Sequence, residues 1–392
     1  MVSPEEGKMD VPVRTLPKYR QILNDLKREI ETGRLRPKDK LPTEAQLGER
    51  YQASRITVAK AVNELLQQGL VSRRAGSGTH VLGGTEPSGH TFGLLILDLG
   101  RTEIFEPICQ GMMASPLAKP HSLLWGHAMG EADLQAEDAI RLCQQYINKK
   151  VAGVFFAPFE FLPCKDDANL AIASTLEKAG IPIVLLDRCY APYPYRSQHD
   201  LVGIDNRTAG YMITSHLLDL GMKRPVFVSR ALSASTVFGR ISGYREALRG
   251  RGLAMQDDLV CEGDTADPKF VQHILDTLKP DSFVCANDLT AGRLISTLGT
   301  LGISVPEQMR VVGIDDVKYA ALFSVPLTTQ HQNCFEIGAV AMATMLQRVE
   351  DPSLPVRDIL LQTTTIVRES CGAKLQEHRS SSEKLAIVRK QA

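Results

Sequence analysis

The chain has 392 residues, 43% of them hydrophobic, and its 45 Lys and Arg balance its 45 Asp and Glu. This length leaves room for more than one domain. No stretch approaches the roughly 20 apolar residues that a membrane-spanning helix needs, and residues 1–10 lack the apolar core of a signal peptide. We therefore expect a cytoplasmic protein with no membrane partner. The eight cysteines form no CxxC pair and the nine histidines show no metal-binding spacing, so we predict neither metal nor cofactor.

The first 82 residues predict three helices followed by a hairpin. In chain order these are a helix with apolar residues at Tyr19, Ile22, Leu23, Leu26 and Ile30; a short helix through Leu47 and Tyr51, capped by Thr43; a helix from Arg55 to Gln68, capped by Ser54 and ended by Gly69; and strands 70–74 and 79–82 around a glycine turn. Two capped helices with a tight connection are typical of a helix-turn-helix.

Charge and helical spacing indicate DNA as the partner of this region. Residues 11–82 hold 14 Lys and Arg against 7 Asp and Glu, whereas residues 83–392 hold 30 against 35. A basic segment joined to an acidic remainder favours phosphate binding by the segment. In the third helix a buried stripe of Val58, Val62, Leu65 and Leu66 leaves Arg55, Thr57 and Lys60 exposed near the N-terminal end, which usually meets base edges.

The motifs of this region resemble those of the GntR family of bacterial transcription regulators. They are Pro17-Lys18-Tyr19, Leu41-Pro42-Thr43-Glu44, Ser54-Arg55-Ile56-Thr57-Val58, Gly69-Leu70-Val71 and Gly76-Ser77-Gly78-Thr79. The resemblance implies a winged helix-turn-helix whose DNA-contacting set is Thr43, Glu44, Ser54, Arg55, Thr57, Lys60, Arg73, Arg74, Gly76, Ser77 and Gly78. Ala45 and Ala59 stand where many members carry arginine, and Lys60 is expected to compensate in part.

After a flexible linker at residues 83–90, apolar strands alternate with helical patterns, which predicts parallel sheets covered by helices on both faces, an α/β fold. The predicted strands are 92–97, 122–125, 153–156, 183–186, 201–204, 225–228, 282–285 and 310–314, and the predicted helices are 105–117, 131–149, 169–179, 207–220, 240–249, 268–278 and 289–301. Two such sheets suggest two lobes with a cleft between them. The predicted domains are residues 11–82, 91–370 and a polar tail at 371–392.

Polar residues at strand ends indicate a ligand site in this cleft. Asp187, Asn287 and Asp315 directly follow apolar strands, and Arg240 opens a predicted helix. Ligands of open α/β sheets bind outside the carboxyl ends of strands, and carboxylates, amides and guanidinium groups match the vicinal hydroxyls of sugars. Asp288 is instead expected to cap the helix that starts at Leu289, and Asp316 the segment that follows it. Phe105 and Trp125 are the aromatic candidates for stacking on a sugar, with Phe105 preferred, but packing in the core is favoured for both.

The second half is similar to the effector-binding half of LacI/GalR regulators, which is itself similar to periplasmic sugar-binding proteins. The residues that carry this resemblance are Val202-Gly203-Ile204-Asp205-Asn206, Arg240-Ile241-Ser242-Gly243-Tyr244, Cys285-Ala286-Asn287-Asp288, Val311 to Asp316 and Pro326 to Gln330. It implies Arg240, Asn287 and Asp315 as ligand contacts, with Asp187 and Thr236 as additions. A GntR-like head on such a body resembles arabinose-responsive repressors.

The two resemblances together imply a repressor that binds double-stranded operator DNA as a homodimer and responds to a small ligand, preferably a sugar. A purine or other non-sugar effector stays open. A plain sugar-binding protein or an enzyme is disfavoured, because a DNA-binding head is present and neither GxxxxGK[ST] nor GxSxG occurs. Residues 83–90 cannot form the hinge helix that joins head to body in typical LacI/GalR members.

Overall fold

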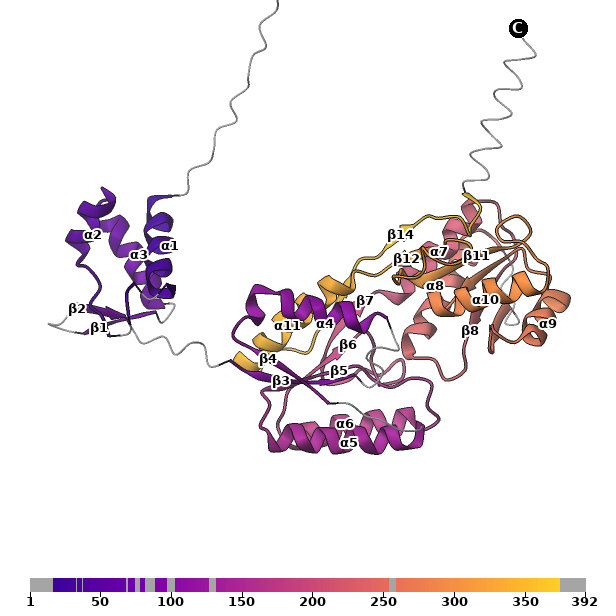
Figure 1. The fold of residues 1–392 in the computed structure, drawn as a ribbon, viewed down its shortest axis with the longest axis horizontal. Helices are drawn as coiled ribbons and strands as arrows, with labels where there is room; N and C mark the ends of the chain where they lie inside the picture. The colour runs from indigo at the N-terminus through magenta and orange to yellow at the C-terminus, as the bar shows by residue number, and fades with distance from the viewer. Residues whose placement is uncertain are drawn as a thin grey trace, which may run out of the picture. The chain divides into compact units, whose positions relative to one another are not determined.

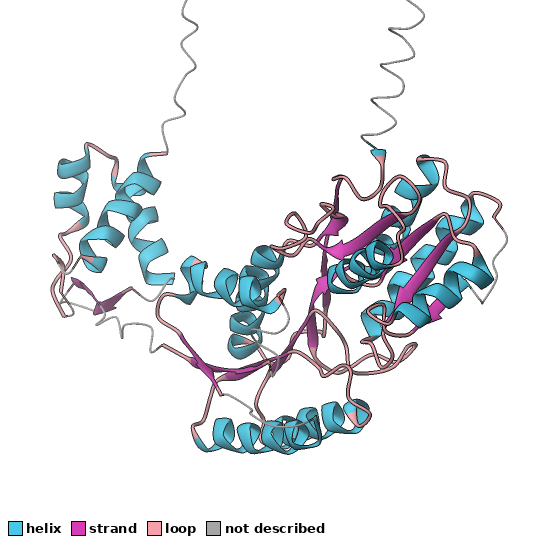
Figure 2. Ribbon diagram, turned by 45° about the vertical axis from the view of Figure 1, so that its right-hand side comes forward, coloured by secondary structure: helices cyan, strands magenta, loops and turns pink. Residues whose placement is uncertain are grey.

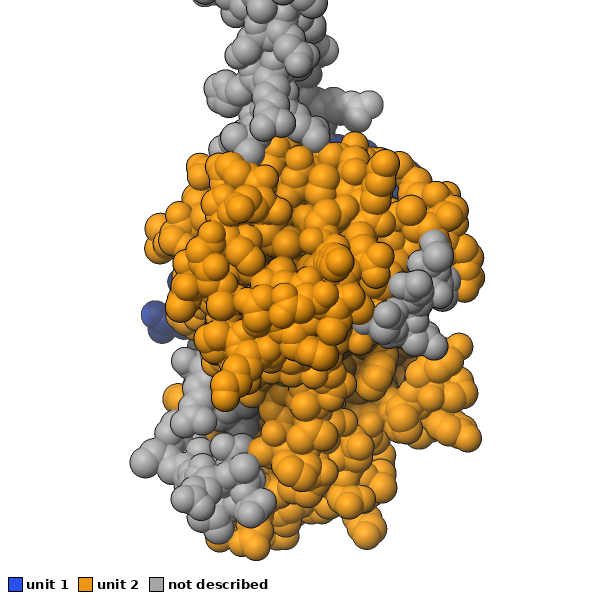
Figure 3. Space-filling view, turned by 90° about the vertical axis from the view of Figure 1, so that its right-hand side faces the viewer, with its two compact units in different colours: residues 1–88 blue, residues 89–392 orange. Residues whose placement is uncertain are grey.

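The protein is described here by a computed structural model, which covers residues 17–32, 34–36, 38–67, 70–74, 78–81, 89–96, 103–126, 132–253 and 259–373. Internal contacts divide the chain into two units, residues 1–88 and residues 89–392 (Figure 3). We call them the head and the body and describe each by itself. Most of the predicted linker and nearly all of the predicted tail lie outside the described residues.

The head is a helical core with a two-stranded wing. Its elements are α1 (Lys18–Glu31), α2 (Glu44–Tyr51), α3 (Arg55–Gln67), β1 (Val71–Arg74) and β2 (Gly78–Val81). The strands pair antiparallel, with Val71 opposite Val81. Both of these valines are buried together with Val58, Val62 and Leu65, so the predicted apolar stripe of α3 faces the core. Burial of this stripe holds the opposite side of α3 outward.

Side-chain caps fix where the short helices begin. The Thr43 Oγ1 atom accepts a hydrogen bond from the Gln46 backbone N–H at 3.3 Å, and the Gln46 side chain accepts one from the Thr43 N–H at 2.8 Å. This reciprocal pair is a capping box. Ser54 Oγ accepts from the Thr57 N–H at 3.3 Å at the start of α3. Both predicted caps are therefore present, whereas Gly69, the predicted end of α3, lies outside the described residues.

The body consists of two lobes, each built on a six-stranded sheet (Figure 1; Figure 2). The sheet of lobe 1 has the order β13-β7-β6-β5-β3-β4 and is parallel throughout. Lobe 1 contains β3 (Thr91–Leu95), α4 (Phe105–Ala114), the 3-10 helix η1 (Pro116–Ala118), β4 (Ser122–Trp125), α5 (Ala132–Asn148), β5 (Gly153–Phe156), α6 (Lys165–Lys178), β6 (Ile183–Leu186), β7 (Asp200–Ile204), α11 (Cys334–Glu350) and β13 (Asp358–Leu361).

The sheet of lobe 2 has the order β14-β12-β11-β10-β8-β9, and its one antiparallel pairing joins β12 to β14. Lobe 2 contains α7 (Asn206–Asp219), β8 (Pro225–Ser229), α8 (Ser235–Gly250), β9 (Val260–Glu262), α9 (Pro268–Leu278), β10 (Ser282–Cys285), α10 (Asp288–Thr300), β11 (Arg310–Asp315), β12 (Thr328–His331) and β14 (Thr364–Ile366). The chain passes between the lobes three times, after β7, after β12 and after β13.

Helices cover both faces of each sheet, as predicted. In lobe 1, Phe155 of β5 packs in the core beneath α4 and α11, while its neighbours Val154 and Phe156 pack in the core beneath α5 and α6. Figure 1 shows these two helix pairs on opposite sides of the lobe 1 sheet. Successive side chains of a strand point to opposite faces, so a strand covered on both sides is apolar throughout.

Several element boundaries differ from the predicted ones. Helix α6 begins at Lys165 rather than Asn169, and α8 begins at Ser235 rather than Arg240. The first turns of both helices lie outside the apolar periodicity on which the prediction depended. The sequence pattern predicts no element after Ile314 and none at β9. Helix α11 and strands β12, β13 and β14 all follow that point.

Candidate functional site

Three of the residues predicted to contact DNA meet around one carboxylate of the head. Glu44, the first residue of α2, accepts a hydrogen bond through Oε1 from Arg73 Nη2 of β1 at 2.7 Å. Its Oε2 lies 3.6 Å from Arg55 Nε at the start of α3, and the Arg55 side chain is 89% exposed. Two guanidinium groups, one from the helix and one from the wing, thus lie on one exposed surface, where phosphates and base edges can be contacted.

Other predicted DNA contacts already have partners within the head. Thr43 and Ser54 cap helices, and the Thr57 and Ser54 hydroxyl oxygens lie 2.8 Å apart. The Lys60 ammonium lies 4.2 Å from the ring centroid of Tyr19, so it links α3 to α1 by a cation–π contact. The sequence analysis did not identify this role for Tyr19.

The remaining predicted DNA contacts belong to the wing, the hairpin of β1 and β2. Gly78 has a φ of +100°, and a Cβ atom there would lie 2.7 Å from Lys40 Cε, so the start of β2 requires glycine. The backbone of Arg74 pairs with Gly78 across the hairpin. Gly76 and Ser77 lie outside the described residues.

The body buries a second cluster of predicted residues around Arg240, in the second turn of α8 rather than at its start. Arg240 is 4% exposed, and its guanidinium donates to Asn206 Oδ1 at 2.9 Å, to the Ala286 carbonyl oxygen at 2.5 Å and to Asp315 Oδ1 at 3.2 Å. These acceptors begin α7, follow β10 and end β11. Arg240 therefore ties together the carboxyl end of the lobe 2 sheet.

Close packing of α8 against α7 determines where Arg240 lies. A Cβ atom on Gly243 would lie 1.9 Å from the Arg207 carbonyl oxygen of α7. Tyr244, the next residue, is buried and donates its hydroxyl hydrogen to the Pro225 carbonyl oxygen at 2.8 Å. The Gly243-Tyr244 part of the sequence motif thus serves helix packing, and Arg240 one turn earlier faces the cleft.

Asp315, at the centre of this cluster, has a strained backbone conformation and a raised side-chain pKa. Its φ is +129°, which few non-glycine residues adopt, and strain of this kind is concentrated at functional sites. Gln332, just after β12, donates from Nε2 to Asp315 Oδ1 at 3.0 Å. Burial raises the pKa of Asp315 to about 7; the charge of Arg240 opposes the rise, while Asp187 and Glu160 add to it. A small change in the cleft can therefore change its protonation near neutral pH.

A matching cluster lies in lobe 1 around Arg188. Its Nη1 lies 2.5 Å from Glu160 Oε1, its Nε donates to Asp187 Oδ2 at 3.1 Å, and its guanidinium carbon lies 5.4 Å from the ring centroid of Phe105. Burial alone would lower the pKa of Arg188, but the charges of Glu160 and Asp187 outweigh this effect and raise it. Glu160 also accepts a hydrogen bond through Oε2 from the Ala234 N–H of lobe 2 at 3.3 Å, so this cluster reaches lobe 2.

Two acceptor atoms in these clusters have no donor within the described structure. Asp187 Oδ1 and Gln332 Oε1 are both buried and accept no hydrogen bond from the described residues. Asp187 also has a φ of +66°. A buried acceptor without a donor costs about 1–3 kcal/mol. One such atom in each cluster indicates a place for a ligand that donates hydrogen bonds to both lobes.

The remaining predicted ligand residues are placed less centrally. Asn287 caps α10, where its Oδ1 accepts from the Thr290 N–H at 2.9 Å and from the Thr290 hydroxyl at 2.7 Å. Thr236 is half-buried in the first turn of α8. Phe105, the first residue of α4, is 3% exposed beneath Arg188, so the guanidinium rather than open space lies over its ring.

The expectation that Asp288 caps the helix after it and that Asp316 caps the segment after it is wrong. Asp288 is buried and accepts from the Thr329 hydroxyl at 2.6 Å and from the Val317 N–H at 3.0 Å, and burial raises its pKa. It therefore connects α10 to the ends of β11 and β12. Asp316 lies 2.6 Å from Arg368 Nη2 and 2.9 Å from His331 Nδ1. Asn287 occupies the N-cap position of α10, so its side chain rather than that of Asp288 reaches the free Thr290 N–H.

Comparison with known proteins identifies both domains. Residues 18–81 match the bacterial regulatory proteins of the gntR family, and residues 214–371 match the periplasmic binding protein-like domain. The chain is 26% identical to an arabinose metabolism transcriptional repressor of Geobacillus stearothermophilus, over 91% of this chain and 98% of that protein. The chain is a transcription regulator that combines a gntR-type DNA-binding domain with a periplasmic-binding-protein-like domain.

Further relatives of this regulator are also repressors. It is 28% identical to the HTH-type transcriptional repressor PurR of Aliivibrio salmonicida, over 71% of this chain and 81% of that protein. The solved structure of the transcriptional regulator CelR in complex with cellobiose covers 84% of this chain and all of that one, with a TM-score of 0.62 and 21% identity, and so shares the fold. The relatives are regulators and not enzymes. None of the described helices of this regulator is long and apolar enough to cross a membrane.

Sequence reasoning missed four polar residues of the regulator's cleft: Glu160, Arg188, Asn206 and Gln332. Arg188 directly follows Asp187, and Gln332 follows the motif that ends at Gln330, so both stand one or two residues beyond a recognised signal. Glu160 lies four residues past β5, in a loop without any strand-end pattern. Its role becomes visible only when the fold brings it to Arg188.

Proposed function

We propose that this regulator is a repressor whose body binds a neutral sugar between its lobes, and that the sugar changes the affinity of the head for double-stranded operator DNA. The observation that carries the proposal is the pair of buried acceptors without donors, Asp187 Oδ1 in lobe 1 and Gln332 Oε1 in lobe 2. Two hydroxyl groups on one small ring supply a donor to each. The sugar thereby completes hydrogen bonding in both lobes at once.

The charges of the cleft favour a neutral ligand over an anionic one. Two guanidinium groups, those of Arg188 and Arg240, face the carboxylates of Glu160, Asp187 and Asp315. The positive charges are already balanced, so a bound phosphate or carboxylate would bring an uncompensated charge into a buried site. The similar fold with bound cellobiose and another with bound ribose agree with a sugar.

Control of DNA binding follows from how the lobes are joined. A ligand that bonds to both lobes favours one lobe orientation over others, and such differential binding typically couples two sites by about 1–3 kcal/mol. Tight binding to DNA by a winged head of this size needs two heads on two half-sites. We therefore infer a homodimer, acting in the cytoplasm where the chromosome lies.

Exposed apolar side chains offer a surface for the second copy. Met113 and Leu117, in and just after α4, are 48% and 53% exposed, and Leu322 after β11 is 82% exposed. The segment after β11 lies against α4, because Lys318 Nζ is 3.4 Å from Glu106 Oε2. Each lobe thus carries exposed apolar side chains, and we propose that dimer contacts made through both lobes respond to the lobe orientation.

In the head, we propose that Arg55 and Thr57 of α3 contact base edges or nearby phosphates and that Arg73 of the wing contacts a phosphate. The exposed position of Arg55 and its shared contact with Glu44 support this assignment. Both arginines would release part of their contact with Glu44 to the DNA.

The testing experiment is a thermal denaturation panel with pentoses, hexoses, sugar phosphates and purines. A ligand that binds only the native state raises Tm in proportion to the logarithm of its concentration over Kd. We expect a neutral sugar to raise Tm and its phosphate ester not to do so. A selective rise with a purine or with a sugar phosphate would contradict the assignment of the cleft and leave the DNA-binding function standing.

Two variants separate the two functions. Gln332→Met keeps the size of the side chain but removes the Oε1 acceptor, so we expect at least a tenfold weaker sugar affinity with unchanged operator affinity. Arg55→Ala should weaken the affinity for operator fragments, which are selected from random duplexes, and leave the sugar affinity unchanged. Arg251→Ala is the control, because this half-exposed arginine at the end of α8 pairs with Asp219 away from both sites. The assignments are contradicted if either variant loses both functions or loses neither of them.

A further inference from the structure

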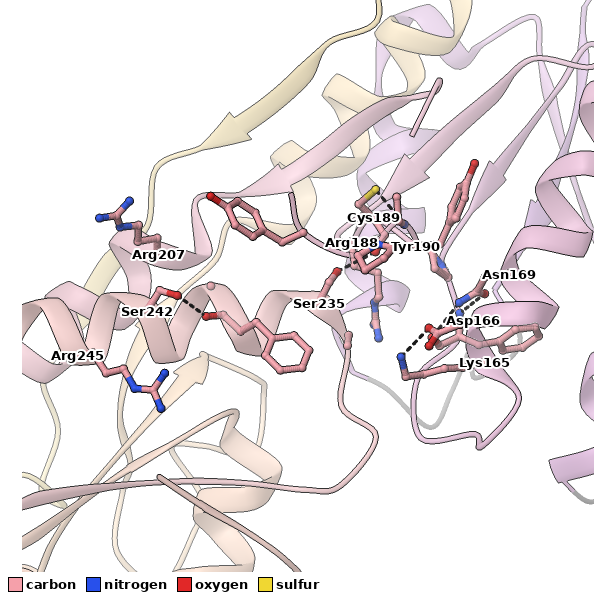
Figure 4. A pocket seen from close by; sticks show the side chains of 18 of the residues that line it. Lys165, Asp166, Asn169, Arg188, Cys189, Tyr190, Arg207, Ser235, Ser242 and Arg245 are labelled. Carbon is pink, nitrogen blue, oxygen red and sulfur yellow. Dashed lines mark hydrogen bonds and ion pairs between the residues drawn. The ribbon is translucent and has the colours of Figure 1, made fainter. Parts of the chain in front are cut away.

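The body has a second concave site outside the Arg240–Asp315 cluster. A cavity of about 1090 Å³ lies between the lobes, and its wall includes Lys165, Asn169 and Tyr193 from lobe 1 and Phe238, Ser242 and Arg245 from lobe 2 (Figure 4). Figure 4 shows Lys165, Asp166 and Asn169 on one side of it and Ser242 and Arg245 of α8 on the other. Of the described residues in its wall, Arg188 alone also belongs to the buried clusters.

Hydrogen bonds between the lobes run beside this cavity. The Ser235 hydroxyl donates to the Cys189 carbonyl oxygen at 2.7 Å, and the Ala234 N–H donates to Glu160 Oε2 at 3.3 Å. Nearby, the Phe161 N–H donates to the Leu232 carbonyl oxygen at 2.8 Å. Cys189, Ala234 and Ser235 all line the cavity. A ligand there would therefore contact both lobes at the place where they are joined.

Each lobe contributes an exposed aromatic ring and a balanced ion pair to the cavity. Tyr193 is 94% exposed and Phe238 is 67% exposed. The ion pairs are Lys165 with Asp166 at 2.7 Å in lobe 1 and Arg207 with Glu246 at 2.8 Å in lobe 2. Aromatic faces cover the C–H surfaces of sugar rings, while paired carboxylates and cations both accept from and donate to hydroxyl groups. Arg245 and Arg249 also line the cavity, so this combination suits a ligand that carries several hydroxyl groups.

The size of the cavity exceeds the need of a single sugar ring. Pockets of about 300–1,000 Å³ enclose drug-sized ligands, and the volume of this cavity lies just above that range. We propose that it is a second carbohydrate site, which takes an oligosaccharide or glycoside of at least two rings, and that its occupancy adds to the effect of the sugar in the buried cleft. The proposal rests on the proposed function, since it assumes that the body responds to carbohydrate.

The test compares mono- and disaccharides on the full-length protein by titration calorimetry and by Tm. The probes are arabinose, glucose, arabinobiose, cellobiose and maltose. We expect at least one disaccharide to bind more tightly than its own monosaccharide. Tyr193→Ala and Phe238→Ala should each weaken that disaccharide at least fivefold without changing monosaccharide affinity, because both side chains are exposed and their removal leaves the fold intact.

Tyr195→Ala is the matched control. Tyr195 lies two residues from Tyr193 in the same loop and is 75% exposed, but it does not line the cavity. This variant should bind every probe as the parent protein does. The proposal is overturned if Tyr193→Ala and Phe238→Ala bind disaccharides unchanged, or if no disaccharide exceeds its monomer.

The same titrations distinguish the failure of this proposal from the failure of the proposed function. The second site alone is refuted if Gln332→Met weakens monosaccharide binding while Phe238→Ala leaves disaccharide binding unchanged. Binding of none of the sugars refutes both proposals.

Discussion

Replacing Arg240 with alanine should destabilise the body, and the loss should grow with pH. The buried guanidinium donates to acceptors from three separate places: Asn206 Oδ1, the Ala286 carbonyl oxygen and Asp315 Oδ1. Alanine leaves all three without this donor. Removal of one partner of a buried ion pair typically costs about 3–5 kcal/mol of unfolding free energy, so we expect a loss of that size for Arg240→Ala at neutral pH.

The pH dependence follows from the carboxyl group that stays behind. Burial raises the pKa of Asp315 to about 7 in the folded protein, against the opposing charge of Arg240. A raised folded-state pKa means that the folded state binds more protons, so stability falls as pH rises from the unfolded pKa to the folded one. In the parent protein this fall ends near pH 7. Without Arg240 the pKa rises further, and the fall continues above pH 7 at up to about 1.4 kcal/mol per pH unit.

Urea unfolding at pH 6 and pH 8 measures both effects. Trp125, the single tryptophan of the chain, lies in the body and reports its unfolding by fluorescence. Arg251→Ala is again the control and should change the unfolding free energy by less than about 1 kcal/mol, as expected for a surface ion pair. A loss in Arg240→Ala that is equal at both pH values, or no larger than that of the control, would refute the reasoning.

Three further predictions concern other parts of the regulator. Glu44→Ala should lower operator affinity, because it releases Arg55 and Arg73 from the contact that they share. It should raise affinity for random duplex DNA, because it removes one negative charge. Fluorescence anisotropy measures both affinities, and equal changes on the two DNAs would contradict this. Sugar binding should release protons near pH 7, because a hydroxyl donor stabilises the ionised form of Asp315; calorimetry in buffers of different ionisation enthalpy measures the release, and Asp315→Asn should abolish it. Gly243→Ala should lower the unfolding free energy of the body by about 1–3 kcal/mol in urea titrations, since its Cβ atom would press on the Arg207 carbonyl oxygen, whereas Gly299→Ala, with open space around its Cα, should not.

The parts of the fold that follow from local rules could be predicted from the sequence. Thr43 and Ser54 are caps by residue type and position, and the stripe of Val58, Val62 and Leu65 repeats at helical spacing. Asp187 and Asp315 could be located because they directly follow buried strands. In each case the signal lies within about one turn or one strand of the residue itself.

The remaining features depend on partners far away in the sequence. Glu160 is a cleft residue because the fold brings Arg188 to it, and nothing near Glu160 indicates that contact. Helix α11 packs Gly338 against the Ile108 carbonyl oxygen of α4 and buries Thr344 as well as its apolar residues. Its pattern therefore lacks the single apolar stripe by which surface helices are recognised. The choice of Asn287 rather than Asp288 as the cap of α10 is likewise decided by packing.

The three passages of the chain between the lobes have a consequence for biosynthesis. Lobe 1 begins at β3 but receives α11 and β13 only after almost all of lobe 2 has been made. A nascent chain that ends before Cys334 lacks α11, one of the two helices that cover the face of the lobe 1 sheet with Phe92, Phe155 and Val184. It also leaves β7 as an unpaired edge. Unpaired edges and uncovered apolar faces promote aggregation. A premature stop codon even late in the gene would therefore yield an aggregation-prone fragment rather than a shortened regulator. Neither lobe of the body can be produced by cutting the gene at one point.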